Sequence, residues 1–158
     1  MTPQPQKRPR SSWQRFTADQ PNELWQADTT HWQPADATPA EILNILDEHS
    51  RLDAVSDAYA ATTGHDALRS FRRGFRRHGI PAGVLTDNAA IFTAIPRRDG
   101  RVALEIELGL LRVKISHSRA YHPQTCGKVE RFHQTLKKWL ANQRRAATVA
   151  GLQAQLDR

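Results

Sequence analysis

The chain has 158 residues, with 23 Lys and Arg against 16 Asp and Glu, which gives a net charge of +7. This length is enough for one domain with its own core, and the positive charge favours polyanionic partners. No apolar run is long enough to span a membrane, no segment resembles a signal peptide, and Cys126 is the only cysteine. We therefore expect a cytoplasmic protein without an internal disulfide or a cysteine metal cluster.

The first 20 residues are rich in proline and basic side chains, with no acid before Asp19. Such a segment is either a solvated leader or a basic arm along a phosphate backbone, and its residues favour neither. We divide the chain into this leader (residues 1–20), a core (residues 21–145) and a short tail (residues 146–158), which forms a short helix or a frayed end.

The core begins with three predicted strands. Residues 24–30 (LWQADTT) form the first, and residues 41–47 and 51–60 form a hairpin. Asp28 lies within or at the end of the first strand, although Asp is depleted in strands. A local conflict of this kind is typical of a functional site.

A helix is predicted over residues 65–78, with Gly79 as its stop. It carries five arginines: Arg69, Arg72, Arg73, Arg76 and Arg77. These side chains either bind DNA phosphates or form a solvated face, and the second interpretation is slightly favoured.

A short apolar strand over residues 82–86 runs directly into Asp87. A carboxylate at the end of a buried strand lies on the rim of the sheet, where sites are common in α/β proteins. A helix over residues 101–111 and a strand over residues 112–116 follow.

The stretch from Tyr121 to Leu140 predicts a turn followed by a long amphipathic helix. Its apolar side chains recur at steps of three and four and form one buried stripe: Val129, Phe132, Leu136 and Trp139 or Leu140. Glu130 lies off that stripe, on a face shared with His133, Gln134 and Lys137. For a Glu seen alone, pairing with a neighbour on the helix surface is the usual role.

Asp28, Asp87 and Glu130 are far apart in the chain. They meet only if the sheet places the first and fourth strands side by side and the last long helix packs across them. The order of elements permits this arrangement in a mixed sheet with a hairpin and crossover connections.

Four motifs in this order carry a resemblance: WQADTTHW (25–32), ILDEHSR (45–51), HGIPAGVLTDNAAIF (78–92) and SRAYHPQTCGKVERFHQTLKKWL (118–140). The chain resembles the catalytic core of DDE transposases and retroviral-type integrases, most of all the bacterial branch of the IS3 and IS481 insertion sequences. The resemblance implies an α/β fold of the RNase H type, with a mixed five-stranded sheet flanked by helices.

The same resemblance implies that Asp28, Asp87 and Glu130 are catalytic and hold two Mg²⁺ (or Mn²⁺) ions. Hard oxygen ligands suit these ions, and a pair of them stabilises the attacking and leaving oxygens of a phosphodiester exchange. The implied activity is a polynucleotidyl transfer: cleavage of a DNA strand, followed by its transfer to target DNA, in transposition and recombination.

Supporting roles follow from the resemblance as well. Asn88 is expected to orient Asp87. The residues expected to contact DNA are His122, Gln124, Lys128, Arg131 and Lys137. The expected partners are DNA, as element ends and as target, and either further copies of the chain or a full-length transposase. The expected location is the bacterial cytoplasm, at the nucleoid.

The chain departs from the family pattern at several positions. Ala89 and Cys126 stand where the family usually has Gly and Asn, and the spacing between Asp87 and Glu130 is longer than usual. If the backbone at position 89 requires a positive φ, Ala is strained there and displaces Asp87.

Three other interpretations stay open. The same acids serve a nuclease of the RNase H type, which cuts without joining. The departure at Ala89 and the lack of an end-binding region in this chain favour a truncated, non-catalytic remnant that binds DNA or dimerises. A zinc site at His117, His122 and His133 is only weakly indicated. Asp47 and Glu48, at a hairpin turn, are interpreted as structural.

Overall fold

A computed structural model describes residues 18–97, 100–117 and 123–158. Its sheet has five strands in the order β3-β2-β1-β4-β5. The three antiparallel strands are β1 (Leu24–Trp32), β2 (Ala40–Asp47) and β3 (Asp53–Tyr59). The parallel side adds β4 (Gly83–Thr86) and β5 (Lys114–His117) to β1. The predicted mixed five-stranded sheet is confirmed.

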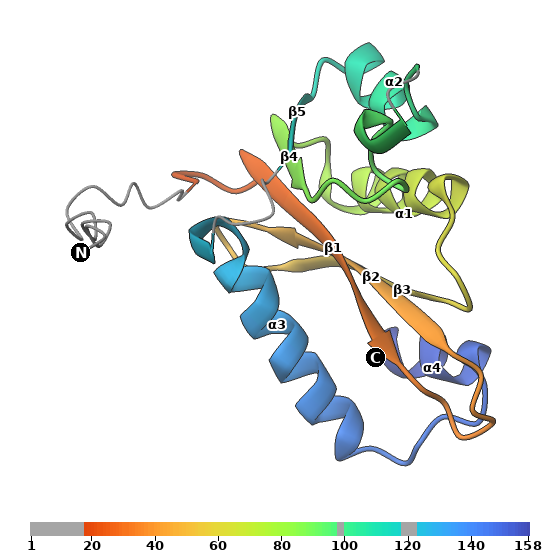
Figure 1. Ribbon diagram of the computed structural model, residues 1–158. Helices are drawn as coiled ribbons and strands as arrows, with labels where there is room; N and C mark the ends of the chain where they lie inside the picture. Colours follow the sequence, from red (N-terminus) through yellow and green to blue (C-terminus); the bar gives the residue numbers. More distant parts are fainter. Residues whose placement is uncertain (1–17, 98–99, 118–122) are drawn as a thin grey trace, which may run out of the picture.

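Helices cover both faces of this sheet (Figure 1). One face carries α1 (Gly64–His78) and α2 (Ala103–Leu110), and we call it the α1 face. The other carries α3 (Pro123–Ala141) and α4 (Val149–Leu156), and we call it the α3 face. A short 3-10 turn, η2 (Ile95–Arg97), precedes α2. No helix in the described ranges is both long enough and apolar enough to cross a bilayer.

The local sequence explains where α1 begins and ends. Thr63 accepts a hydrogen bond from the backbone N–H of Asp66, whose side chain accepts one from the N–H of Thr63. This reciprocal cap fixes the first turn. At the other end Gly79 has a φ of 87°, which a side chain would disfavour, and its N–H donates to the carbonyl of Phe75. The predicted stop at Gly79 is confirmed.

Two apolar clusters hold the layers together. On the α1 face the buried side chains of Trp25, Ile45 and Phe71 belong to the larger cluster. Gly74 of α1 allows this packing, because a Cβ there would lie 3.0 Å from the Trp25 ring and 3.1 Å from Val55. On the α3 face the smaller cluster contains Ala40, Ile42, Leu140, Ala146 and Leu152.

The last residues of the chain form part of this second cluster. Leu152 of α4 is fully buried, and the side-chain amide of Gln153 pairs with the outer edge of β3. Its oxygen accepts from the N–H of Ala58 at 2.7 Å, and its nitrogen donates to the carbonyl of Ser56 at 3.1 Å. The short helix expected in the tail is present and docked on the sheet. The division of the chain at residue 145 stays a prediction.

Candidate functional site

The topology places Asp28 and Asp87 next to each other. Strands β1 and β4 run parallel, and Ala27 is the register partner of Thr86. Asp28 is the next residue of β1, and Asp87 is the first residue after β4. Alternation along β1 puts Trp25 and Ala27 on the α1 face, so the Asp28 side chain lies on the α3 face. Glu130 lies on α3, which packs against β1.

Burial and the charges of both other acids act on Asp28. The pKa of Asp28 is raised from 3.8 to about 6, chiefly because the carboxyl is buried. The charges of Asp87 and Glu130 raise it further, while a hydrogen bond from the backbone N–H of Thr29, 2.7 Å from Oδ1, lowers it. Asp87 and Glu130 are themselves exposed. The result is a group of carboxylates that is half-buried at Asp28 and open to solvent at the other two.

A backbone amide orients Asp87. The N–H of Ala89 donates to Oδ1 of Asp87 at 2.9 Å. Among the described residues, positive φ outside glycine occurs only at Asn22, Ala37, Arg51 and Arg112, so Ala89 is not strained in this way. The Ala89 side chain packs against the α1-face cluster. The strain considered for Ala at this position is therefore absent. Asn88 is exposed, and its expected role in orienting Asp87 stays a prediction.

A polar chain lies directly behind Asp87. Thr86 is 2% exposed, and its hydroxyl lies 2.8 Å from Nδ1 of His117, its register partner on β5. Nε2 of His117 lies 3.8 Å from a carboxylate oxygen of Glu105 on α2. Glu105 also accepts from the hydroxyl of Thr93 at 2.7 Å. These contacts tie the ends of β4 and β5 to α2 and place His117 in a structural role.

Lys128 is paired with a carboxylate that sequence reasoning placed elsewhere. Its ammonium contacts Oε1 of Glu48 and lies 3.4 Å from the Glu48 carbonyl. Glu48 was interpreted as a turn residue, but its side chain is only 2% exposed and points to α3. Eighty positions separate the two residues, so no local signal in the sequence indicated this contact. The expected contact of Lys128 with DNA stays a prediction.

Asp47, next to Glu48, is structural as expected. It accepts hydrogen bonds from the backbone N–H of Asn22 at 3.0 Å and of Ser50 at 2.9 Å, and from the Ser50 hydroxyl. Burial alone would raise the pKa of Asp47, but these hydrogen bonds lower it below its usual value. The turn between β2 and β3 is thereby fixed against the start of β1.

The remaining residues expected to contact DNA are distributed along α3. Arg131 and Lys137 are exposed on this helix. Gln124 lies in the first turn of α3, and its side chain is outside the described part. His122 lies outside the described residues. Their roles stay predictions, as do those of the three acids.

His133 faces inward, contrary to its expected place on the face of Glu130. It is half-buried, and its Nε2 has no partner among the described residues. Burial, helped by the charge of Lys137, lowers the pKa of His133 to about 4, so the ring is neutral at pH 7. The inner stripe of α3 runs through Val129, His133 and Leu140, while Trp139 is 39% exposed. The expectation that Trp139 or Leu140 ends the stripe is settled in favour of Leu140.

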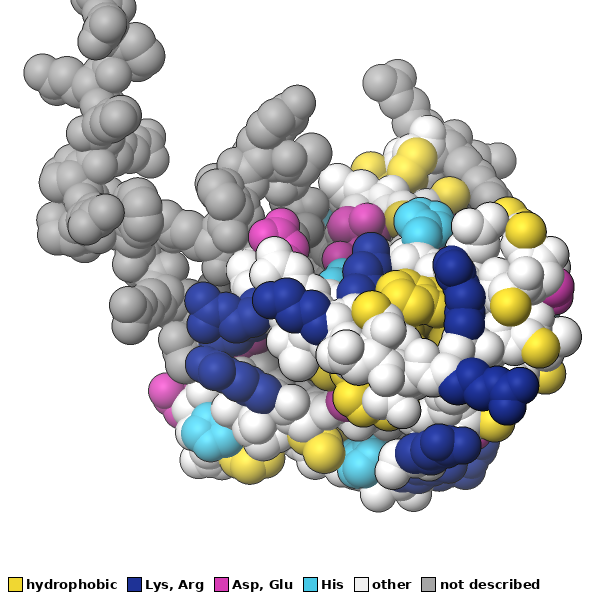
Figure 2. Space-filling model, turned by 90° about the horizontal axis from the view of Figure 1, so that it is seen from below, with side chains coloured by type: hydrophobic (Ala, Val, Ile, Leu, Met, Phe, Trp, Pro, Cys, Tyr) yellow, Lys and Arg dark blue, Asp and Glu magenta, His cyan; other side chains and the backbone are white. Residues whose placement is uncertain are grey.

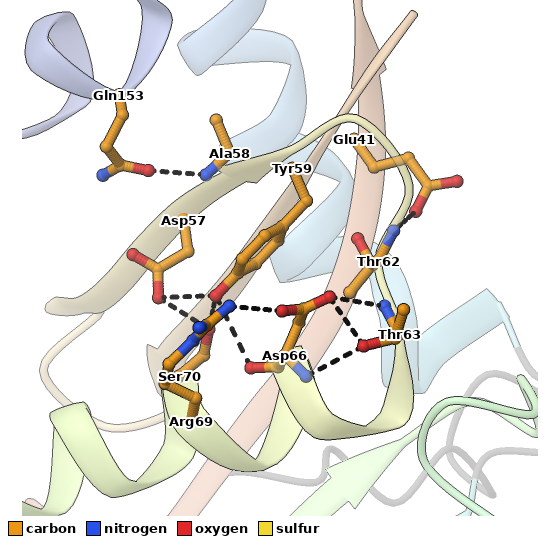
Figure 3. A network of polar contacts seen from close by, with 10 residues as sticks. All are labelled: Glu41, Asp57, Ala58, Tyr59, Thr62, Thr63, Asp66, Arg69, Ser70 and Gln153. Carbon is orange, nitrogen blue, oxygen red and sulfur yellow. Dashed lines mark hydrogen bonds and ion pairs between the residues drawn. The ribbon is translucent and has the colours of Figure 1, made fainter. Parts of the chain in front are cut away.

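The arginines of α1 are largely occupied by acids. Arg69 pairs with Asp66, Arg72 makes two contacts with Glu107 of α2, and Arg73 pairs with Asp57 of β3. Figure 3 shows the surrounding network, in which the hydroxyls of Tyr59 and Ser70 meet the Asp57 carboxylate. These pairs favour a structural role for the three arginines over binding of phosphates.

The net positive charge lies elsewhere. Residues 123–158 contain seven Lys and Arg against two acids, whereas residues 18–122 contain 12 against 14. The surplus is thus concentrated in the first 17 residues and in the segment of α3 and α4. Figure 2 shows the end of the molecule at which α3 finishes, where Lys and Arg side chains flank an apolar patch. This distribution favours contact of a polyanion with the segment of α3 and α4 over the rest of the described core.

The described part of the chain contains no set of three His, Cys, Asp or Glu side chains that converge on one ion as they stand. The chemistry of the three acids nevertheless suits divalent cations: all their donors are carboxylate oxygens, and their mutual repulsion is relieved by positive charge.

Comparison with protein families decides the identity of this fold. Residues 18–123 match the model of the integrase core domain, and residues 111–158 match a second integrase core domain model. The chain belongs to the integrase core domain family. The transposase of transposon Tn552 from Staphylococcus aureus is 28% identical to this integrase core over 141 residues, which are 80% of the chain. The chain spans only 28% of the length of that transposase.

Solved integrase structures share the fold of this integrase core. In the simian T-cell lymphotropic virus intasome bound to the PP2A regulatory subunit B56 gamma, one chain matches with a TM-score of 0.67 and 20% identity, covering 85% of this chain and 48% of that one. The trimeric HTLV-2 integrase catalytic core with magnesium matches with a TM-score of 0.59 and 21% identity, covering 77% of this chain and 74% of that one. The BIV integrase catalytic core matches with a TM-score of 0.55 and 25% identity, covering 76% of this chain and 70% of that one. The RNase H-like fold is confirmed; the IS3 and IS481 branch stays a prediction.

Proposed function

We propose that this integrase core catalyses metal-dependent cleavage and transfer of DNA strands in transposition. The observation that carries the proposal is that Asp28 lies on β1 beside the end of β4, which Asp87 follows, while α3, which carries Glu130, packs against β1. The charges of Asp87 and Glu130 also raise the pKa of Asp28. These three acids are the ones that the resemblance to the family implies are catalytic, and their places on β1, after β4 and on α3 support the proposal. Membership of the family and the match to the Tn552 transposase support the reaction class.

Each acid has a distinct part in this proposal. By the resemblance to the family, Asp28 would hold both metal ions, and Asp87 and Glu130 would each hold one of them. Bound Mg²⁺ or Mn²⁺ would stabilise negative charge on the phosphate and activate the attacking oxygen.

The surroundings suit a large substrate. Asp87 and Glu130 are exposed, so a DNA strand can approach without opening the protein. Arg131 and Lys137 lie further along the same helix as Glu130, in the segment that carries the surplus of positive charge. We infer that DNA lies along α3, with element ends and target as the partners. We also infer that several copies of the chain assemble. The structures with the same fold include a viral intasome and the trimeric and dimeric forms of the HTLV-2 integrase core.

The first test is calorimetric titration of the chain with Mn²⁺, beside Asp87→Asn. Asp87 is exposed, so this variant removes a charge without disturbing the core. Asp157→Asn, at the residue that caps the end of α4, is the matched control, since Asp157 is also exposed. Binding by the parent and by Asp157→Asn, with loss in Asp87→Asn, supports the site.

Assays with DNA then separate the alternatives. Metal-dependent cleavage followed by joining to a second duplex supports a transposase. Cleavage without joining supports a nuclease of the RNase H type. Absence of Mn²⁺ binding, both alone and with a DNA duplex present, contradicts the proposal and leaves a non-catalytic remnant as the better interpretation.

A further inference from the structure

One ion pair connects α3 to the β2–β3 turn. The ammonium of Lys128 contacts the Glu48 carboxylate and lies 3.4 Å from the Glu48 backbone carbonyl. The Glu48 side chain is 2% exposed and that of Lys128 35% exposed, so the contact is largely shielded from water. Among the described residues, it is the only ion pair between α3 and another element.

The Glu48 end of this pair is fixed to the strand that carries Asp28. The N–H of Glu48 donates to the carbonyl of Leu24, the first residue of β1, at 2.9 Å. The preceding residue, Asp47, holds the turn through its hydrogen bonds with Asn22 and Ser50. The backbone at Glu48 is therefore held against the start of β1, the strand that carries Asp28.

The Lys128 end of the ion pair lies on the same helix as Glu130. The two residues are two positions apart on one helix, a rise of about 3 Å along its axis. The apolar anchors of α3 in the smaller cluster, Leu136 and Leu140, lie in its C-terminal half. In the N-terminal half, the pair with Glu48 and the buried Val129 are the described contacts that hold the helix.

We propose that Glu48 is a positioning residue for the reaction and acts through Lys128. By holding the N-terminal half of α3 against the β2–β3 turn, it brings the Glu130 carboxylate to face Asp28. This inference deepens the proposed function and rests on it. In this arrangement Lys128 serves first to place α3, and the Glu48 carboxylate already neutralises its charge before DNA arrives.

The direct test is Glu48→Gln, which keeps the shape of the side chain and removes its charge. We expect Mn²⁺ affinity to fall at least tenfold and hydrogen exchange to accelerate at the backbone amides of residues 128–133. Exchange over residues 136–141 stays unchanged. Glu107→Gln, which removes the acid from the pair with Arg72 on the other face, is the matched control and changes neither quantity. Unchanged Mn²⁺ affinity and unchanged exchange in Glu48→Gln overturn the proposal.

A double-mutant cycle distinguishes positioning from a role of Lys128 in binding DNA. Lys128→Met leaves a buried carboxylate without a partner and is the variant at risk of unfolding; Glu48→Gln/Lys128→Met removes that risk. If the pair positions Glu130, the double variant loses no more Mn²⁺ affinity than Glu48→Gln, and Lys128→Arg keeps most of it. If Lys128 only binds phosphate, the double variant loses affinity for a DNA duplex and binds Mn²⁺ as the parent does, which overturns the proposal.

The exchange measurement keeps the two proposals separate. A parent chain that binds no Mn²⁺, either alone or with a DNA duplex present, contradicts the proposed function. Faster exchange confined to the N-terminal half of α3 in Glu48→Gln still supports the positioning contact in that case, and unchanged exchange rejects it.

Discussion

The backbone N–H of Ala89 donates a hydrogen bond to the Asp87 carboxylate, 2.9 Å away, from a residue whose φ is negative. Replacing Ala89 by the Gly usual in the family therefore relieves no strain. We expect Ala89→Gly to lower the free energy of unfolding by up to about 1 kcal/mol, because it frees the unfolded chain and removes a packed methyl group. Urea denaturation measures this, with Ala90→Gly, an exposed neighbour, as the control. A more stable Ala89→Gly contradicts this view of the loop.

Asp28 gives the first prediction for the dependence of stability on pH. Its folded pKa of about 6 lies above the ordinary value of 3.8, so its contribution to stability is full below pH 4 and is lost as the pH rises through 6. In chelator at pH 8 we expect Asp28→Asn to be more stable than the parent by about 2 kcal/mol, and near pH 4 the difference disappears. Thermal unfolding at both pH values checks this. The reverse order at pH 8 contradicts a folded pKa of Asp28 that burial and the neighbouring acids raise.

Metal provides the complementary test of Asp28. Mn²⁺ stabilises a folded protein that binds it, by an amount that grows with concentration above the dissociation constant. We expect Mn²⁺ to raise the Tm of the parent and to leave that of Asp28→Asn unchanged. An equal rise in both proteins places the bound ion elsewhere.

His133 has the opposite dependence on pH. Its folded pKa of about 4 lies below the ordinary 6.5, so its contribution is full above pH 6.5 and is lost as the pH falls toward 4. We expect His133→Gln to be more stable than the parent at pH 4.5, by about 2 kcal/mol relative to their difference at pH 8. His65→Gln on α1, where the ring is exposed, serves as the control. Parallel stability curves for His133→Gln and the parent would show that the ring reaches solvent.

Two arginines of α1 allow the contribution of a largely buried ion pair to stability to be compared with that of a surface ion pair. Arg73 pairs with Asp57, whose side chain is 8% exposed, whereas Arg69 is 69% exposed. We expect Arg73→Gln to lose about 3 kcal/mol of unfolding free energy, because the Asp57 carboxylate stays buried without its cation. Arg69→Gln changes stability little. If the two variants are equally stable, solvent reaches Asp57 in the folded protein.

The sequence predicted the elements well where the local pattern was strong. The apolar strands, the helix closed by Gly79 and the long helix after Pro123 all carry short-range signals that tertiary contacts do not override. The family motifs singled out Asp28, Asp87 and Glu130, and in the structure the charges of the last two act on Asp28; their catalytic roles stay predictions.

The sequence pattern did not predict which side of α3 faces the sheet or which residues pair with it. Phe132 and His133 are adjacent, and both fit a spacing of three or four from Val129, so periodicity alone does not decide which faces inward. The pairing of Glu48 with Lys128 depends on how the β2–β3 turn meets α3, a relationship set by the whole sheet. The docking of α4 depends in the same way on the exposed edge of β3.

That edge has a consequence for how molecules of this chain meet. An outer strand presents unpaired backbone groups, and another strand can add to them and extend the sheet between molecules. Here the amide of Gln153 imitates such a neighbour, because it occupies one donor and one acceptor of β3 at Ala58 and Ser56. The last helix thus covers part of this edge of the sheet. Fewer backbone groups of β3 are left to pair with a strand of another molecule.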